Sequence, residues 1–309
     1  MTTADPKDQK APEDMRCGIV ALIGAPNAGK STLVNQLVGA KVSIVTHKVQ
    51  TTRGRIRGIL VDGNSQIILA DTPGIFAPRR RLDRAMVDAA WTSAGDADVI
   101  ALIVDAPKGI DEDVERILRR LPDAGANSIL ILNKVDRMTK EPLLSLAQEI
   151  TDRATFDATF MISALNGSGV KDLRAYLAAA VPLGHWLYPE DELSDAPLRF
   201  LAAEITREKL YLRLHQELPY ASTVETTEWK KLKSGDVRIE QTIFVERDSQ
   251  RQIVLGKGGR TIKQIGQDAR KEIAEIIETN VHLFLFVKVR EHWGDDPERY
   301  REMGLDYPK

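Results

Sequence analysis

Short apolar runs alternate with longer amphipathic stretches along the first half of the chain. The clearest of these runs cover 19–23, 66–70, 99–104 and 128–132. Such alternation is typical of a mostly parallel sheet flanked by helices. We therefore predict an α/β domain over residues 17–184. Ligands of such sheets bind just beyond the carboxyl ends of the strands, so the polar residues that follow these runs are candidates for chemistry.

The pattern changes after this domain. Residues 185–197 contain Pro189, acidic side chains and Ser194, which is typical of an interdomain linker. Beyond the linker, we expect a second domain over 198–309 that is smaller and of the α+β class. Its predicted elements are a helix over 198–214, paired strands over 221–231 and 237–246, a helix over 260–279, a strand over 281–289 and a tail with Trp293 and Tyr300.

Composition narrows the picture only slightly. The chain has 309 residues, of which 43% are hydrophobic and 28% charged, as in ordinary globular proteins. Its 43 basic and 45 acidic residues nearly cancel, which neither shows nor excludes nucleic-acid binding. A single cysteine, Cys17, excludes an intramolecular disulfide and fits the cytoplasm. We expect residues 1–16, which are polar, to form a disordered tail. Because the apolar runs are too short to span a bilayer, any membrane contact is expected to be peripheral.

A phosphate-binding motif follows the first apolar run. It matches the G-x-x-x-x-G-K-[ST] pattern between a predicted strand and a helical run that starts at Thr32. Its glycines let backbone N–H groups surround phosphate oxygens, Lys30 neutralises the β and γ phosphates, and the Ser31 hydroxyl ligates Mg²⁺. The motif consists of Gly24, Ala25, Pro26, Asn27, Ala28, Gly29, Lys30 and Ser31.

The residues after a later strand indicate which base is bound. Asn133, Lys134 and Asp136 follow the run 128–132. A carboxylate at this place can accept hydrogen bonds from N1 and N2 of guanine, whereas adenine has no such pair of donors. Asp136 therefore favours GTP over ATP, although so short a motif, taken alone, would often be a surface turn.

Two further stretches end apolar runs and add candidates for the same site. In the first, an acidic group can hold Mg²⁺ through water and a glycine N–H can sense the γ-phosphate; it comprises Asp71, Thr72, Pro73 and Gly74. The second, Ser163, Ala164 and Leu165, can contact the base through backbone N–H groups. Taken alone, each stretch is equally typical of a turn without a binding function.

These stretches, in this order, resemble nucleotide-binding boxes of the translation-factor-like GTPases, and Asn27 with Ala28 resembles their Asn-x-Gly-Lys-Ser subgroup. Residues 50–53 are similar to the first switch of that subgroup, where a threonine completes the Mg²⁺ shell and reports the γ-phosphate. The resemblance assigns this role to Thr52, with Thr51 as the neighbouring alternative. It implies that Ser31, Thr52 and Asp71 hold the metal and that Lys30, Thr52, Gly74 and Asn27 act in catalysis.

The position after Gly74 predicts slow hydrolysis. Ras-like enzymes orient the attacking water with a glutamine after the Asp-x-x-Gly turn, but this chain has Ile75, whose side chain cannot donate or accept a hydrogen bond. In the resembling subgroup, the equivalent of Asn27 helps hold a potassium ion that acts in place of an arginine finger. The resemblance therefore implies that K⁺ stimulates hydrolysis.

A second glycine-rich loop lies in the C-terminal domain, between a short apolar helix and a longer one. This G-x-x-G loop, Gly256 to Gly259, is that of a KH-type module, in which glycines permit close approach of a nucleic-acid strand. The order of elements around it is similar to the type II KH arrangement. Its predicted RNA-binding residues are Gly256, Lys257, Gly258, Gly259, Arg260 and Lys263, with Lys230, Lys231, Lys233 and Arg238 as further candidates.

A GTPase domain of this subgroup followed by a type II KH module resembles the Era family of ribosome-assembly GTPases. The segment between the domains is similar to that family's interdomain signature at 199–200, 204–205, 207–209 and 217–220. The resemblance implies a protein that binds GTP and GDP, recognises 16S rRNA near its 3′ end and acts in maturation of the 30S subunit. We also expect a monomer in the cytoplasm. Peripheral contact with the inner face of the cell membrane is compatible with it.

Three other functions share part of these features. A GTPase of tRNA modification or of large-subunit assembly would have the same nucleotide boxes but not the loop 256–259. An RNA-binding scaffold with an inactive nucleotide fold would have lost Lys30, Ser31 and Asp71, which are present. A GTP-dependent regulator at the membrane is not distinguished by the sequence.

Overall fold

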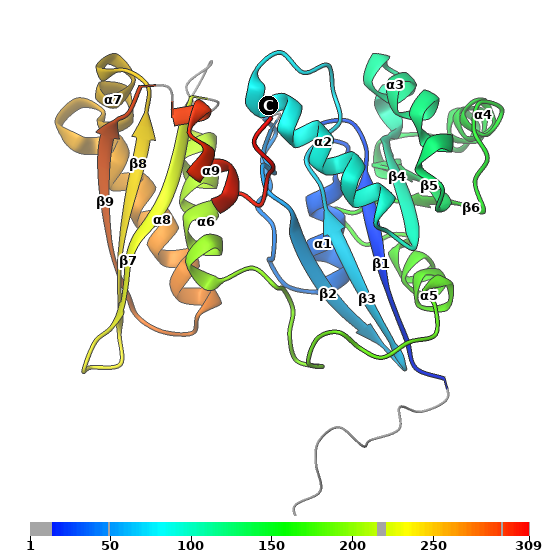
Figure 1. Cartoon of the computed structure of the whole chain (residues 1–309), viewed down its shortest axis with the longest axis horizontal. Helices are drawn as coiled ribbons and strands as arrows, with labels where there is room; N and C mark the ends of the chain where they lie inside the picture. The colour runs from blue at the N-terminus through cyan, green and yellow to red at the C-terminus, as the bar shows by residue number, and fades with distance from the viewer. Residues whose placement is uncertain (1–13, 49, 215–220, 292, 309) are drawn as a thin grey trace, which may run out of the picture.

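The computed structural model of the protein describes residues 14–48, 50–214, 221–291 and 293–308. The tail predicted for residues 1–16 lies outside the described residues as far as residue 13, and its last residue, Arg16, is the first residue of the first strand. Two sheets with their own helices divide the chain, and Figure 1 shows them side by side with the linker crossing beneath them.

The first sheet has six strands in the order β2-β3-β1-β4-β5-β6. Strand β2 runs antiparallel to β3 and the other neighbours pair in parallel, so the predicted α/β class with a mostly parallel sheet is confirmed. The carboxyl ends of β1, β3, β4 and β5 therefore meet at one edge of the sheet. The strands are β1 (Arg16–Ile23), β2 (Ile56–Asp62), β3 (Ser65–Asp71), β4 (Val99–Asp105), β5 (Asn127–Asn133) and β6 (Ala158–Ile162).

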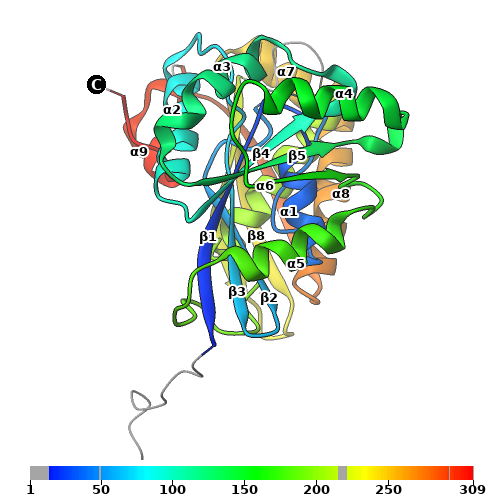
Figure 2. The same ribbon diagram turned by 90° about the vertical axis from the view of Figure 1, so that its right-hand side faces the viewer.

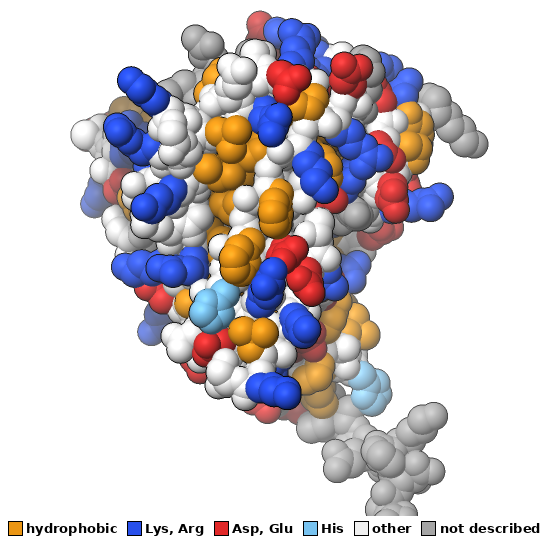
Figure 3. Space-filling model, turned by 90° about the vertical axis from the view of Figure 1, so that its left-hand side faces the viewer, with side chains coloured by type: hydrophobic (Ala, Val, Ile, Leu, Met, Phe, Trp, Pro, Cys, Tyr) orange, Lys and Arg blue, Asp and Glu red, His pale blue; other side chains and the backbone are white. Residues whose placement is uncertain are grey.

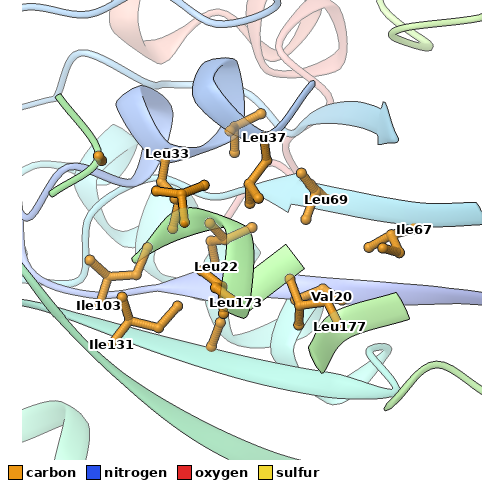
Figure 4. Close-up of a cluster of buried hydrophobic side chains, with 14 of the residues drawn as sticks. Val20, Leu22, Leu33, Leu37, Ile67, Leu69, Ile103, Ile131, Leu173 and Leu177 are labelled. Carbon is orange, nitrogen blue, oxygen red and sulfur yellow. The ribbon is translucent and has the colours of Figure 1, made fainter. Parts of the chain in front are cut away.

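Helices cover both faces of this sheet (Figure 2). Helices α1 (Lys30–Val38) and α5 (Val170–Ala180) pack on one face, where Leu33 and Leu173 meet Leu22 of β1 in one buried cluster (Figure 4). The helices of the other face are α2 (Arg81–Gly95), α3 (Glu112–Arg120) and α4 (Lys140–Thr151). Short 3₁₀ turns follow β4, α3 and β5, namely η1 (Ala106–Lys108), η2 (Leu121–Ala124) and η3 (Val135–Arg137).

The second sheet has three strands in the order β7-β8-β9, with β7 antiparallel and β9 parallel to β8. Apolar residues of its helices pack on one face, which confirms the predicted smaller α+β domain. Its elements are α6 (Leu198–Arg213), β7 (Ser222–Lys231), β8 (Val237–Val245), α7 (Asp248–Leu255), η4 (Lys257–Gly259), α8 (Arg260–Ile276) and β9 (Val281–Val289).

The C-terminal segment 293–307, which we call the C-terminal clasp, returns to the first domain. It contains η5 (Trp293–Asp295) and α9 (Pro297–Glu302). Buried Trp293, Tyr300 and Leu305 form one cluster with Leu82 and Met86 of α2, and α9 lies between α6 and α2 in Figure 1. The sequence predicted this segment to be a tail of the second domain, but in the structure it packs on the first domain.

The linker is held along the edge strand β2. The Ile59 N–H donates to Leu193 O at 2.9 Å, and Ser194 bridges Gly58. Earlier in the linker, the Gln66 side chain bonds the backbone of Tyr188 in both directions. Within the described part of the chain, no helix has both the length and the apolar character needed to cross a bilayer.

Candidate functional site

A cavity of about 480 Å³ lies at the carboxyl edge of the six-stranded sheet. All four predicted nucleotide stretches and the predicted switch contribute to its wall. Gly24, Ala25, Ala28, Asp71, Thr72 and Pro73 belong to these stretches but do not line it. The predicted residues that line it are Pro26, Asn27, Gly29, Lys30, Ser31, Thr32, Thr52, Gly74, Asn133, Lys134, Asp136, Ser163, Ala164 and Leu165.

The phosphate loop leaves no room for side chains at two glycines. A Cβ at Gly24 (φ 157°) would lie 2.3 Å from Ile103 O, and one at Gly29 (φ 103°) would lie 2.1 Å from Asn133 Nδ2. Such backbone is accessible to glycine at little cost. The loop therefore packs directly on β4 and β5, and its N–H groups can turn toward a ligand at the start of α1.

Lys30 is buried and its amine donates to two carbonyls of the same loop. The Nζ atom lies 3.0 Å from both Gly24 O and Ala25 O. Burial lowers the pKa of Lys30 to about 8, against the opposing effect of the Asp71 carboxylate. A cation in such surroundings gains strongly from an arriving anion, which is what a phosphate would supply.

Three oxygen-bearing side chains predicted to hold a metal lie together. Asp71 Oδ2 accepts from Ser31 Oγ at 2.7 Å, and Thr52 Oγ1 lies 2.9 Å from Ser31 Oγ and 3.4 Å from Asp71 Oδ2. The sequence prediction omitted Ser43, whose hydroxyl also donates to Asp71 Oδ2 at 2.7 Å. Burial raises the pKa of Asp71, and these hydroxyls and Lys30 oppose that effect.

The other carboxylate oxygen of Asp71 fits a hard cation. Asp71 is fully buried, and its Oδ1 atom has no hydrogen-bond partner among the described residues. Mg²⁺ takes oxygen ligands, of which one or two are usually carboxylates and the remainder substrate phosphates and waters. The set formed by Asp71, Ser31 and Thr52 meets that requirement.

The two threonines of the switch have different surroundings. Thr51 Oγ1 bonds within its own loop, to Thr46 Oγ1 at 2.6 Å and to Lys48 O at 2.7 Å. Thr52, by contrast, faces Asp71. This geometry favours Thr52 as the residue that reports the γ-phosphate.

Thr72, which was also predicted to bind the nucleotide, makes a hydrogen bond between strands behind the cavity. Its buried hydroxyl donates to Leu22 O at 2.7 Å, so it joins β3 to β1 behind the cavity. The next turn approaches the phosphate loop closely, since a Cβ at Gly74 would lie 2.9 Å from Pro26 and Ile75 N donates to Gly24 O at 3.1 Å. The Ile75 side chain is fully buried in the core.

The base side of the cavity is braced by Asn133 and Lys134. Asn133 Nδ2 donates to Ala28 O at 2.8 Å, and its Oδ1 accepts from Ala164 N at 2.9 Å. Lys134 Nζ reaches both Asn27 O at 2.7 Å and Asp105 Oδ2 at 2.6 Å. The sequence analysis missed Asp105, although its place at the end of the run 99–104 is the signal that identified the other residues.

Asp136 is exposed in η3 on the cavity wall, where its carboxylate is accessible to a ligand. The Ala164 N–H that the sequence offered to the base is already bonded to Asn133. Leu165, which is 80% exposed, borders the cavity beside it.

The loop 256–259 lies in the second domain between α7 and α8 and is an open structure. Gly256, Gly258 and Gly259 have φ values of 70°, 62° and 74°, a region that favours glycine. No atom lies within 4 Å of a Cβ built at Gly258 or Gly259. The backbone conformation therefore explains why glycine occupies these three positions, and at Gly256 the close contact with Thr261 is a second reason.

The cations of this loop are accessible. Lys257, Arg260 and Lys263 are exposed, and none forms a salt bridge with another described residue. On the side where α7 and β9 lie, Figure 3 shows a strip of hydrophobic side chains with Lys and Arg on both sides. Exposed hydrophobic residues of this domain include Ile253, Phe284 and Phe286.

Of the further basic candidates, Arg238 is held by other side chains, whereas the three lysines are exposed. Arg238 pairs with Glu240 and lies 3.7 Å from Glu228, and its guanidinium stacks on Phe284. Lys230, Lys231 and Lys233 are exposed at the hairpin between β7 and β8. Residues 217–220 of the interdomain signature lie outside the described residues.

Comparison with known proteins gives matches over both domains. Residues 19–134 match the family described as 50S ribosome-binding GTPase, and residues 217–294 match the KH domain family. The GTPase Era of Afipia carboxidovorans is 66% identical over 98% of this chain and 98% of its own length. The GTPase Era of Brucella suis is 68% identical over 95% of this chain and 94% of its own length.

Solved structures of similar proteins contain bound nucleotides and, in one case, RNA. A variant of Aquifex aeolicus Era bound to GDP·AlF4⁻ superposes with a TM-score of 0.89 at 37% identity, covering 94% of this chain and 99% of its own. Era in complex with MgGDPNP and nucleotides 1506–1542 of 16S ribosomal RNA superposes with the same score at 38% identity and the same coverage.

Proposed function

This chain belongs to the Era family of GTPases, and from that premise we propose that it is a GTP switch that binds 16S rRNA near its 3′ end and acts in maturation of the 30S subunit. One observation carries the proposal: a preformed nucleotide cavity and an open G-x-x-G loop occur in one chain. A related Era of the same fold holds MgGDPNP and a 16S rRNA fragment together. The KH domain distinguishes this chain from GTPases that share only the nucleotide boxes.

Lys30 and Asp136 fix the two ends of the nucleotide in this proposal. Lys30 exchanges the Gly24 and Ala25 carbonyls for phosphate oxygens, while Asp136 accepts hydrogen bonds from the guanine edge. Asn133 holds the phosphate loop and the base loops at a constant spacing through its bonds to Ala28 and Ala164. The chain thereby positions the substrate before reaction, which is the main task in phosphoryl transfer.

Ser31, Thr52 and Asp71 are the residues that would hold Mg²⁺. When bound there, the metal supplies charge neutralisation for the phosphates. Thr52 would exchange its hydrogen bond to Ser31 for the metal, and it would thereby link the state of the nucleotide to the conformation of the switch. Replacing Thr52 by alanine should weaken binding of a GTP analogue relative to GDP, whereas Thr51→Ala should leave that ratio unchanged.

Hydrolysis without a helper is expected to be slow. The side chain after Gly74 is Ile75, and it points into the core rather than toward the cavity. No glutamine orients the attacking water at this position, so rates on the order of 10⁻⁴ to 10⁻² per second are expected from unassisted enzymes of this class.

A potassium ion beside Asn27 would offset this deficiency. Asn27 Nδ2 donates to His47 O at 3.0 Å, which brings an amide side chain and the switch backbone together at the phosphate end of the cavity. Amide and carbonyl oxygens are suitable ligands for an alkali cation. Hydrolysis should be faster in K⁺ than in Na⁺ at equal ionic strength; equal rates would refute the role of potassium.

The RNA would bind along the G-x-x-G loop. Open space above Gly258 and Gly259 allows a backbone to approach, and Lys257, Arg260 and Lys263 supply unpaired charge at the start of α8. We retain the division into a GTPase domain (17–184), a linker (185–197) and a KH domain (198–309), of which α6, β7 and the C-terminal clasp all contact the GTPase domain.

A matched pair of glycine variants tests the RNA site. Gly258→Asp places a negative side chain over the loop, and Gly63→Asp makes the same change in a turn with nearly the same φ (57° against 62°) and equally open surroundings. We expect Gly258→Asp to abolish binding of an oligonucleotide with the 3′ sequence of 16S rRNA, measured by fluorescence anisotropy, and Gly63→Asp to retain it. Equal binding by both variants would refute RNA recognition by this loop.

A further inference from the structure

Four consecutive residues, Thr51 to Gly54, connect the nucleotide cavity to the second domain. Thr52 faces Ser31 and Asp71, as described above. Its neighbours face the opposite way: Thr51 O accepts a hydrogen bond from the Arg207 guanidinium of α6, and a Cβ at Gly54 would lie 2.6 Å from Met303 O in the C-terminal clasp. The orientation of Thr52 is therefore coupled to the contacts that its neighbours make with α6 and with the C-terminal clasp.

Arg53, between them, makes buried contacts with the second domain. It is only 2% exposed, and its Nη1 donates to Ser222 O of β7 at 2.8 Å. The guanidinium carbon lies 5.7 Å from the ring centre of Tyr211 and 5.4 Å from that of Trp293. A planar cation between two aromatic rings is stabilised most when it is desolvated, and burial at this position lowers the pKa of Arg53.

The aromatic partners are themselves fixed by the second domain and by α2. Trp293 is 2% exposed, and its indole Nε1 donates to Ala221 O at 3.0 Å. It packs on Leu82 and Met86 of α2 in the same cluster. Trp293 thus joins three parts of the molecule: the KH domain, α2 and the switch.

We propose that Arg53 is a positioning residue of the GTPase site, which the KH domain and the C-terminal clasp complete by holding its guanidinium between Tyr211 and Trp293. Thr52 and Arg53 are adjacent and point to opposite sides, so fixing Arg53 directs Thr52 toward Asp71. A domain movement that withdraws Trp293 would release Thr52. This inference rests on the proposed GTP switch and adds the residues through which the second domain influences the first.

Variants at both members of the contact test the inference. Arg53→Ala removes the guanidinium, and Arg53→Lys keeps the charge without its planar face. Trp293→Leu keeps apolar volume without the ring, whereas Trp293→Phe keeps a ring. Arg120→Ala is the matched control, because Arg120 also stacks on a tryptophan, Trp91 at 4.7 Å, away from the switch.

We expect Arg53→Ala and Trp293→Leu to lower kcat for GTP about tenfold and the affinity for a GTP analogue by a similar factor, the scale of a desolvated cation–π contact. Affinity for GDP should change less than twofold, because Thr52 serves the γ-phosphate. Arg53→Lys should resemble Arg53→Ala, while Trp293→Phe should retain at least a third of wild-type kcat. Arg120→Ala should equal the wild type.

Two results would overturn the inference. One is wild-type kcat in both Arg53→Ala and Trp293→Leu. The other is an equal loss of GDP and GTP-analogue affinity in these variants, which would show a merely structural role. Thermal unfolding of each variant identifies any that fails to fold, and Trp293→Leu with Trp293→Phe then decides the question while Arg53 is intact.

The wild type separates this inference from the proposed function. If the wild type binds neither GTP nor the 16S oligonucleotide, the proposed function fails. If it binds both and the Arg53 and Trp293 variants match Arg120→Ala, the inference alone fails.

Discussion

The nucleotide cavity and the G-x-x-G loop are built in opposite ways. In the cavity, residues far apart in sequence brace one another: Asn133 bonds Ala28 and Ala164, and Lys134 bonds Asn27 and Asp105. In the loop, by contrast, three glycines set the backbone locally and the cations extend into solvent. One site is a cavity lined in part by buried polar residues, and the other is an accessible surface.

The difference teaches where single residues should matter. Buried polar groups are worth several times more than exposed ones, because their loss or mispairing is not compensated by water. Exposed cations each contribute a small amount that salt screens. Removing a buried charged group from the cavity should thus have a large effect, and removing a single exposed cation from the loop a small one.

Removing the charge of Lys30 should have the largest effect. Lys30→Met keeps the length of the side chain but supplies no charge to the phosphates, and loss of one such stabilising group lowers kcat by about 10³-fold. Phosphate release from saturating GTP measures it. Lys140→Met, at an exposed position in α4, serves as control, and a loss of less than tenfold in Lys30→Met would contradict the comparison.

A change at the base should rank second. Asp136→Asn loses charge-assisted hydrogen bonds to guanine, which amounts to about 3 kcal/mol or roughly 100-fold in GDP affinity. Xanthosine diphosphate, which has an acceptor where guanine has its amino group, should bind the variant better than GDP does. Titration with fluorescent nucleotides checks both points, and Asp123→Asn at an exposed site should behave as the wild type.

The pH dependence of binding should be third. In the protein without nucleotide, the pKa of Lys30 is about 8, and bound phosphate raises this pKa. Above pH 8, nucleotide binding must therefore be accompanied by protonation of the Lys30 amine. Affinity for GDP should therefore be constant below that pH and fall about tenfold between pH 7 and pH 9. Lys30→Met reports the titration of the guanine itself, and equal pH profiles in the two proteins would exclude Lys30 as the cause.

The smallest effect is expected in the loop. Lys257→Ala should weaken RNA binding only a few-fold at about 0.15 M salt and lower the slope of log K against log salt by about 0.7, the value for one phosphate contact with a single strand. Binding isotherms at several salt concentrations measure both. A 100-fold loss would show that the loop is a braced site like the cavity, and Lys171→Ala in α5 provides the unaffected reference.

The sequence predicted much of both domains for definite reasons. Strand β9 begins and ends where its pattern predicts, and the buried strands of the first sheet were found because continuous apolar runs precede Gly24, Asp71 and Asn133. Motifs with fixed spacing identified residues that line the cavity. Local periodicity and local spacing were sufficient for these features.

What the sequence did not predict depends on contacts between distant segments. Ser43 and Asp105 carry no motif of their own, and only the fold brings them to Asp71 and Lys134. The C-terminal clasp was predicted to be a tail because its apolar residues have no packing partner nearby in the sequence. Its partners are on α2, about two hundred residues earlier.

The pairing of the linker with β2 bears on how this chain avoids association with copies of itself. Strand β2 ends the six-stranded sheet, and an open edge strand is a template for pairing with another chain. The hydrogen bond from Ile59 to Leu193 and the bridge between Gly58 and Ser194 occupy part of that edge. A GTPase domain cut before residue 185 would expose it, and such a fragment should aggregate at concentrations at which the whole chain stays dispersed.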